Sequence, residues 1–392
     1  MIDLTDEQRA IRDEVRAFAR RELAPLAPQI DEQDVYPAEV VQQIARLGVL
    51  GLELPAEWRS GLDSLGHGDP IGATIACEEI AWASAALGNI VSAIRITAFA
   101  LDRFGGDAVK RQWLPPLLRG DCTIGFAVTE PDAGSDLASL GTSARRDGNC
   151  YVLDGAKWPI TFAPIADAFM VLCTLDRFLG TRGMAVLMVE RNRPGVMIGP
   201  PERKLGQLGN PLGGVTFDGV RVPSENLLGE EGQGFKIAMA SLDVTRIDVA
   251  SIALGLSRAA LDAARAHALG RVQFGKPIAD LQAVQFMLAE MATEIEAGQW
   301  LTWRAATVRG QGVRFTREAA MAKVFCSDNC MKHTTNAIQI LGGRGYLKGY
   351  DVERYFRDAK VTQIYDGASE IQKVVIARHV LAEGEQASRQ TS

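Results

Sequence analysis

Apolar residues in the first part of the chain recur at intervals of three and four, which is the period of an amphipathic helix. The first such series is Ile11, Val15, Phe18 and Leu23. It follows a capping box at Thr5 and Gln8 and stops before Pro25, the expected start and stop signals of a helix. Further helices are predicted at residues 37–52, 73–104 and 107–118. Residues 1–122 are therefore expected to form a helical N-terminal domain.

Beyond residue 122 the pattern changes to short β-rich runs separated by Gly, Pro, Asn and Asp, which is typical of strands joined by turns. Strands are predicted at residues 150–161, 167–175, 183–190 and 214–222. These runs predict a sheet domain over residues 123–232.

The helical period returns from residue 233 onward. Long helices are predicted at residues 237–268, 281–309, 316–341 and 369–381. Their apolar positions are spaced as in a helix bundle, so residues 233–392 are expected to form one. The tail at 384–392 is polar and is expected to be disordered.

Charge and hydropathy exclude several classes of partner. The chain has 392 residues and a net charge of −6 without a cluster of Lys and Arg, which argues against a nucleic-acid partner. The longest uncharged apolar run, residues 80–94, is shorter than the roughly 20 residues that cross a bilayer. Residues 1–15 lack the pattern of a signal peptide, so we expect a cytoplasmic protein without a membrane partner.

The six Cys residues are scattered through apolar segments, which favours reduced thiols. Cys326 and Cys330 lie one helical turn apart with His333 nearby, a spacing that could hold a metal ion. No second pair of ligands appears, so thiols on a helix are the favoured interpretation and no metal is expected.

Four stretches have the composition of ligand-binding loops. They are "FAVTEPDAGSD" at 126–136, "RVQFGKPIADLQAVQ" at 271–285, "IQILGGRGYLKGYDVERYFRDAK" at 338–360 and "IYDGASEIQ" at 364–372. Their glycines permit a close approach of the backbone to a ligand, and Arg271 could bind a phosphate with two hydrogen bonds. Any one of them alone is also explained as a tight loop.

Together, in this order and spacing, the four stretches resemble the acyl-CoA dehydrogenase family over essentially the whole chain. The resemblance implies a mainly α fold, with a helical N-terminal domain, a middle β-barrel and a C-terminal four-helix bundle. It also implies a flavoprotein oxidoreductase acting on CH–CH groups in acyl-thioester metabolism. FAD would bind between the domains and at a subunit contact, commonly in a homotetramer.

The resemblance also assigns roles to individual residues. Those expected to contact FAD within one subunit are Phe126, Val128, Thr129, Gly134, Ser135, Ile160, Thr161, Ala368 and Glu370. Thr129 would bind the pyrimidine end of the flavin, Thr161 would donate to N5, and Ser135 would also lie at the substrate entrance. Residues expected to hold the ADP half of a cofactor bound largely to another subunit are Arg271, Gln273, Phe274, Gln282, Gln339, Gly342 and Gly343.

The same resemblance places the catalytic base at Asp366, where the family usually has Glu. A carboxylate there would remove the α-proton of an acyl thioester, helped by hydrogen bonds to the thioester carbonyl and by a dry environment that raises its pKa. Tyr365 and Gly367 flank the base. Asp243 and Arg246 resemble residues that contact CoA, although an i,i+3 surface ion pair is the alternative.

Several residues depart from the family pattern. Asp is one methylene shorter than Glu, and a misplacement of about 1 Å can cost about a hundredfold in rate. The family's other base position would be Thr245, which cannot act as a carboxylate. Pro159 stands where an aromatic residue usually precedes "IT", with Trp158 displaced by one position. An Asp base also occurs in nitroalkane oxidase, which pairs it with an Arg where this chain has Lys373.

Residues 89–99 correspond to the helix at the far end of the family's acyl pocket. Ser92 is expected to face the acyl tail with Arg95 beside it. Arg95 would then bind a distal anion of the substrate, or it would pair with a protein carboxylate at a domain contact, which we favour. The loop at 54–66 lacks the Gly-Gly pair often seen in members of the family, which would change the substrate entrance. The acyl group could therefore be carried by CoA or by an acyl-carrier protein.

The function predicted from sequence is therefore FAD-dependent α,β-dehydrogenation of an acyl thioester, with an electron-transferring flavoprotein as acceptor. One alternative is the same fold used for another reaction that begins with an α-carbanion: a nitroalkane-type oxidase, a decarboxylating dehydrogenation or a cyclisation. The other is a flavoprotein that has lost catalysis and acts as a binding partner.

Overall fold

A computed structural model describes residues 4–59, 65 and 69–390. Part of the loop at 54–66 therefore lies outside the described residues. The N-terminal domain is helical, as the sequence pattern predicts, and contains helices α1 to α6, of which α2 was not predicted. Their bounds are Asp6–Phe18, Ala27–Gln33, Ala38–Arg46, Pro70–Ala83, Ala85–Phe104 and Asp107–Leu118. The predicted capping box of α1 is present, because Thr5 and Gln8 each bind the backbone N–H of the other.

The single helix predicted at 73–104 is two helices, which corrects the prediction. Ser84 has an extended backbone with φ of −156° and separates α4 from α5. Its hydroxyl accepts a hydrogen bond from the N–H of Leu87 and so caps the start of α5. α5 is long and apolar enough to cross a membrane by composition alone, but it is mostly buried within the protein. It is a core helix.

The middle domain is built on a sheet of eight strands, counted over the described residues. The strands β1 to β8 are Ile124–Ala127, Ser143–Asp147, Cys150–Thr161, Ala168–Thr174, Met184–Glu190, Val196–Ile198, Leu212–Pro223 and Leu227–Leu228. They pair in the order β6-β7-β3-β2-β4-β5-β8, and β1 pairs with β4. Of the predicted flavin contacts, Phe126 lies in β1, and Ile160 and Thr161 end β3.

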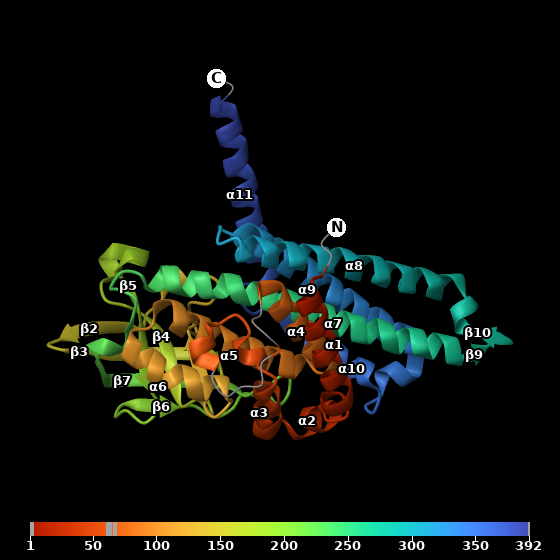
Figure 1. Cartoon of the computed structure of the whole chain (residues 1–392), viewed down its shortest axis with the longest axis horizontal. Helices are drawn as coiled ribbons and strands as arrows, with labels where there is room; N and C mark the ends of the chain where they lie inside the picture. Colours follow the sequence, from red (N-terminus) through yellow and green to blue (C-terminus); the bar gives the residue numbers. More distant parts are fainter. Residues whose placement is uncertain (1–3, 60–64, 66–68, 391–392) are drawn as a thin grey trace.

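The C-terminal part contains α7 at Gly234–Gly270, α8 at Gln282–Gly310, α9 at Thr316–Leu341, α10 at Asp351–Lys360 and α11 at Ser369–Gln390. A two-stranded hairpin of β9 (Val272–Gln273) and β10 (Lys276–Pro277) separates α7 from α8. α7 runs along much of the body, from the sheet at one end to this hairpin at the other (Figure 1). α11 projects away from the body and continues to Gln390, so the expected disorder of the tail is wrong up to that residue.

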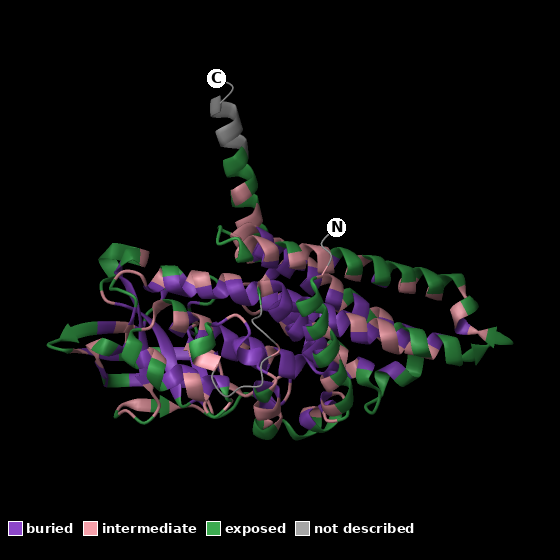
Figure 2. Ribbon diagram, in the orientation of Figure 1, coloured by how far each residue is buried: buried purple, intermediate pink, exposed green. Residues whose placement is uncertain are grey.

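The most buried part of the protein lies where α4 and α5 pack against the first half of α7 (Figure 2). Small residues permit this close packing. A Cβ at Gly255 on α7 would lie 2.3 Å from the carbonyl oxygen of Glu78 on α4. The base loop and the predicted substrate residues of α5 and α7 border this region.

Candidate active site

The predicted base lies in a tight loop between the short helix at Val361–Gln363 and α11. Asp366 has φ of +51° and Gly367 has φ of +92°, so two consecutive residues adopt left-handed backbone. For a residue other than Gly this conformation costs about 1–2 kcal/mol. The positive φ of Gly367 favours Gly, and a Cβ there would lie 2.5 Å from Nε2 of Gln372 and displace that amide.

Buried side chains from three helices hold the two carbonyl groups of this loop. The carbonyl oxygen of Asp366 accepts hydrogen bonds from Arg246 Nε and Gln372 Nε2, both at 3.2 Å. The carbonyl oxygen of Gly367 accepts from Lys323 Nζ and Gln372 Nε2, both at 2.8 Å. Arg246 lies on α7, Lys323 on α9 and Gln372 on α11. The loop is therefore fixed from several sides in a conformation that its sequence alone does not favour.

The carboxylate of Asp366 is in the electrostatic environment that a proton-abstracting base needs. Burial raises its pKa above the ordinary value, while the charge of Lys323, a hydrogen bond with Thr245 and the charge of Arg246 oppose this. Burial lowers the pKa of Lys323 to about 8, although the Asp366 charge opposes the shift. Thr245, which cannot itself act as a carboxylate base, forms a hydrogen bond with the predicted base Asp366.

Arg246 also forms an ion pair with Asp243, with 2.6 Å between Nη1 and Oδ1. This is the i,i+3 alternative of the sequence analysis, but the pair is buried and not at the surface. Oδ2 of Asp243 accepts a hydrogen bond from Thr316 at the start of α9, at 2.6 Å. Asp243 therefore orients the guanidinium that contacts the base loop.

The strand ends that carry the predicted flavin contacts lie together. A Cβ at Gly125 in β1 would lie 3.2 Å from Cγ2 of Ile160 in β3. The N–H of Trp158 donates to the carbonyl oxygen of Thr129 at 3.0 Å. Buried Lys157 donates to the carbonyl oxygen of Val128 at 3.1 Å and pairs with Glu130 at 2.8 Å. Phe126, Val128 and Thr129 are thus joined to Ile160 and Thr161.

The displaced tryptophan has a structural explanation. The pairing of β3 with β7 shifts between Lys157 and Ile160, so β3 is irregular there. The Trp158 side chain is 42% exposed, and its Nε1 donates to Glu202 at 2.8 Å. Phe162, the residue after Thr161, is fully buried. Gly134 and Ser135 are exposed in the loop after β1.

The residues predicted to hold an ADP group lie far from these strands, around the β9–β10 hairpin at the other end of the body (Figure 1). All seven are exposed: Arg271, Gln273, Phe274, Gln282, Gln339, Gly342 and Gly343. A cavity of about 470 Å³ lies beside them, with Arg271, His267 and Arg344 in its wall. A Cβ at Gly342 or Gly343 would meet no atom within 4 Å, so there is room for a ligand. Two guanidinium groups and open glycines suit a pyrophosphate.

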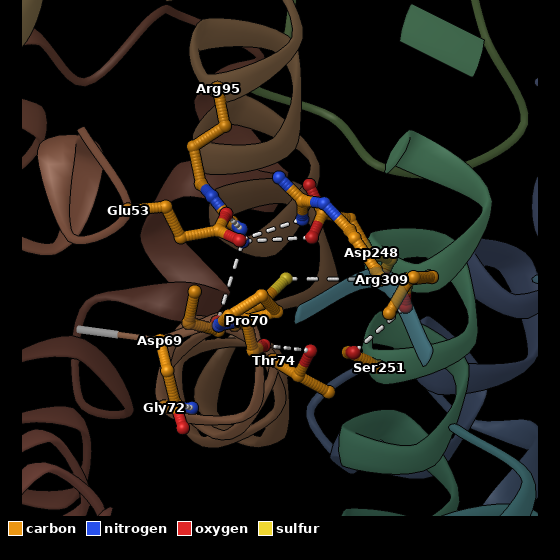
Figure 3. A network of polar contacts seen from close by, with 12 residues as sticks. Glu53, Asp69, Pro70, Gly72, Thr74, Arg95, Asp248, Ser251 and Arg309 are labelled. Atoms are coloured by element: carbon orange, nitrogen blue, oxygen red, sulfur yellow. Dashed lines mark hydrogen bonds and ion pairs between the residues drawn. The ribbon is translucent and has the colours of Figure 1, made fainter. Parts of the chain in front are cut away.

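Arg95 does not have the free guanidinium that binding of a distal anion would need. It is 5% exposed and pairs with Asp248 at 2.8 Å and with Glu53 (Figure 3). Arg309 at the end of α8 pairs with the same Glu53 at 2.7 Å. Arg95 therefore forms the ion pair with protein carboxylates at a domain contact that the sequence analysis favoured. Ser92 is buried close to Asp248, whose pKa is raised to about 6 by burial.

The remaining predicted residues lie around the base loop. The Tyr365 hydroxyl is 3.5 Å from Nε2 of Gln207, and burial raises the pKa of that hydroxyl. Ala368 is partly buried, and Glu370 is exposed in the first turn of α11. No group of three potential metal ligands is found in the described ranges. His333 instead contacts Glu294 at 2.9 Å, and Cys326 and Cys330 are buried thiols.

Sequence reasoning missed Lys323, Gln372, Asp248 and Glu53. Gln372 could have been found from the sequence, because it lies within the stretch "SEIQ" that follows the predicted base. Lys323 also had a signal, because it is a single charge in the run "AAMAKVF". Asp248 and Glu53 had none.

A helical domain, a β domain and a helical bundle that holds the Asp366 loop form the arrangement that the sequence resemblance implies, and comparisons with known families identify the class of protein. Residues 5–121, 125–220 and 232–381 match the N-terminal, middle and C-terminal domains of acyl-CoA dehydrogenase. The chain belongs to the acyl-CoA dehydrogenase family, which consists of FAD-dependent oxidoreductases.

Individual relatives agree along nearly the full length. The chain is 41% identical to the mitochondrial short-chain specific acyl-CoA dehydrogenase of Bos taurus, over 97% of this chain and 91% of the relative. Butyryl-CoA dehydrogenase from Megasphaera elsdenii has a TM-score of 0.93 and 38% identity, covering 97% of this chain and 100% of that chain.

Two further solved structures bear on partners and carriers. A chain in the structure of the electron transferring flavoprotein of Acidaminococcus fermentans has a TM-score of 0.93 and 37% identity, covering 97% of this chain and 99% of that chain. The prolyl acyl carrier protein oxidase AnaB has a TM-score of 0.91 and 30% identity, covering 96% and 100%.

Proposed function

We propose that this protein catalyses the α,β-dehydrogenation of a short, uncharged acyl thioester with Asp366 as the base. The observation that carries the proposal is the half-buried Asp366, which lies in a loop fixed by Arg246, Lys323 and Gln372. The high identity to a short-chain specific acyl-CoA dehydrogenase supports it.

In this proposal Asp366 removes the α-proton and so becomes neutral, a step favoured by its raised pKa. The backbone N–H of Asp366 binds the thioester carbonyl oxygen, where negative charge develops. Bound FAD supplies the acceptor for the hydrogen and electron pair that leave the β-carbon. Thr129 and Thr161, at the joined ends of β1 and β3, would orient the flavin ring.

The polar network on α5 supports an uncharged acyl group. Two cations of the described residues at this domain contact, Arg95 and Arg309, are already paired with Glu53 or Asp248. Binding a second carboxylate would require one of these buried pairs to break, which costs about 3–5 kcal/mol. We therefore expect butyryl-CoA to be a substrate and glutaryl-CoA to be a poor one.

We also propose that two copies of the chain complete each cofactor site. Arg271 and the β9–β10 hairpin lie at the opposite end of the body from β1 and β3, so Arg271, with Gly342 and Gly343, would serve a flavin held by another copy (Figure 1). The exposed apolar residues Val374, Val380 and Leu381 of the projecting α11 support a homo-oligomer. An electron-transferring flavoprotein is the proposed oxidant, in line with the relative from Acidaminococcus fermentans.

The second candidate is oxidation of an acyl group bound to a carrier protein. The similarity to AnaB, together with the unusual loop at 54–66, favours this possibility. The two functions differ in the fate of the electrons. Rapid reoxidation by O2 with peroxide release identifies an oxidase, whereas slow reoxidation with transfer to an electron-transferring flavoprotein identifies a dehydrogenase.

The test is an anaerobic spectral titration of the FAD-loaded protein with butyryl-CoA, glutaryl-CoA and the corresponding carrier-protein thioesters. Flavin bleaching with butyryl-CoA that is abolished in Asp366→Ala supports the proposal, and Asp366→Glu tests whether the longer acid fits. Full FAD occupancy without bleaching by either CoA thioester contradicts it, and bleaching by the carrier-bound form alone selects the second candidate.

A further inference from the structure

The loop that carries Asp366 is held along its length by one face of α9. Ser327 donates to the carbonyl oxygen of Thr362 before the loop, at 2.9 Å. Asp328 accepts hydrogen bonds from Gln363 at 2.7 Å and from Ser369, after the loop, at 3.0 Å. Lys323, one turn earlier on α9, donates to Gly367 between these points. Lys323 and Ser327 are spaced by four and share a face of the helix, and Asp328 follows directly, so α9 acts here as a clamp.

Lys323 is the most unusual member of this clamp. Its side chain is fully buried, although a Lys ammonium carries three donors and is strongly hydrated in water. Burial of an ammonium group is costly, because the charged form loses its hydration. A buried Lys therefore calls for an explanation in terms of what it binds. Its ammonium donates a hydrogen bond to the carbonyl oxygen of Gly367, and Asp366 is the carboxylate that interacts with it most strongly.

We propose that Lys323 is a positioning residue for the catalytic base. In this role its ammonium fixes the Gly367 carbonyl, keeps the loop in its left-handed conformation and presents a positive charge to the Asp366 carboxylate. The inference rests on the proposed function of Asp366 as base and adds a residue that acts through it.

The charged groups around the pair determine the expected pH behaviour. Lys323 on α9 and Arg246 on α7 face Asp366, and both lower its pKa against the effect of burial. Burial lowers the pKa of Lys323, and the charge of Arg246 lowers it further. The carboxylates of Asp366, Asp328 and Glu370 raise it. Removing the Lys323 charge therefore raises the pKa of Asp366, and the base is ionised only at higher pH.

Two substitutions separate the two effects of Lys323. Lys323→Met removes both the hydrogen bond to Gly367 and the charge. Lys323→Gln removes the charge but keeps a donor. Lys332→Met is the matched control, because Lys332 lies on the same helix, is partly exposed and pairs with Glu290 and Glu294.

The experiment measures the rate of flavin bleaching by butyryl-CoA from pH 5 to pH 9 in each FAD-loaded variant. We expect both Lys323 variants to shift the midpoint upward by about one pH unit or more, since one unit corresponds to a modest charge interaction. The plateau rate of Lys323→Met should fall about tenfold to a hundredfold, as expected when a base is misplaced by about 1 Å. Lys323→Gln should lose less at the plateau.

FAD content and butyryl-CoA affinity should stay close to those of Lys332→Met. A wild-type pH midpoint and plateau in FAD-loaded Lys323→Met would overturn the proposal. Loss of FAD without a shift in the rate profile of the loaded fraction would also overturn it, because it would indicate a structural role alone.

A second measurement does not depend on the substrate. Infrared difference titration of the wild type and Lys323→Gln, each against its Asp366→Asn counterpart, reports the protonation of Asp366 directly. An upward shift in Lys323→Gln supports the inference, and an unchanged titration contradicts it. If no thioester bleaches the wild type, the proposed function fails while this titration still decides the role of Lys323.

Discussion

Replacing Arg95 by Met tests the ion-pair network between the N-terminal domain and the C-terminal helices. The substitution removes the partner of Asp248, which is 1% exposed, and leaves Glu53 paired with Arg309 (Figure 3). Breaking a buried ion pair from one side costs about 3–5 kcal/mol, because the remaining charge has no compensation. We therefore expect the free energy of unfolding at pH 8 to fall by about this amount.

The loss should depend on pH in a defined direction. Burial already raises the pKa of Asp248 to about 6, and removal of Arg95 raises it further. A carboxyl whose folded pKa is raised destabilises the protein above that pKa and does so less as the pH falls, because the folded state then binds a proton. Each pH unit below the new pKa recovers at most about 1.4 kcal/mol. Between pH 8 and pH 6 the loss should shrink by about 2 kcal/mol.

The assay is equilibrium urea unfolding in excess FAD at pH 6 and pH 8, followed by tryptophan and flavin fluorescence. Arg265→Met is the matched control, because Arg265 forms an exposed ion pair with Asp262 on α7. It should cost less than about 1 kcal/mol and show no such pH dependence. A loss in Arg95→Met below about 1 kcal/mol, or an equal loss at both pH values, would refute the reasoning.

Three further predictions concern the active site and the helix that begins the fold. Gly367→Ala should lower the bleaching rate by butyryl-CoA about a hundredfold or more while FAD stays bound, because a Cβ there meets Gln372; an unchanged rate in stopped-flow measurements would contradict this. Lys157→Met should reduce FAD content measured by absorbance, because it leaves Glu130 without its cation at the joint of β1 and β3, whereas Lys110→Met on α6 should not. Thr5→Ala should cost about 1 kcal/mol of stability in urea unfolding, since it removes one half of the capping box; Thr5→Ser should retain most of it.

Local patterns predicted the elements well where the controlling interactions are local. β3 and α9 have the bounds expected from the β-rich run at residues 150–161 and the helical period of residues 316–341. The break at Ser84 was missed, because the apolar positions continue across it. α11 was predicted to end nine residues too early, since the polar composition of the tail does not exclude a helix.

The candidate site was predicted only as far as its motifs extend. Asp366 and Arg246 were found because they lie in recognisable stretches, and the structure brings them together at the base loop. Their supports depend on tertiary contacts between distant segments: Lys323 lies 44 residues from Gly367, and Arg95 lies 153 residues from Asp248. A sequence without side-chain geometry does not reveal such pairs.

The length of α7 has a genetic consequence if each cofactor site is shared between two copies. One uninterrupted helix of 37 residues, about 55 Å long, connects the region of Arg246 to Arg271 at its far end. A variant at Asp366 is defective in the half of the site that holds the base. A variant at Arg271 is defective in the half that it contributes to the site of another copy. Mixed oligomers of the two would contain one site with both halves intact, so two inactive alleles would complement each other when expressed together.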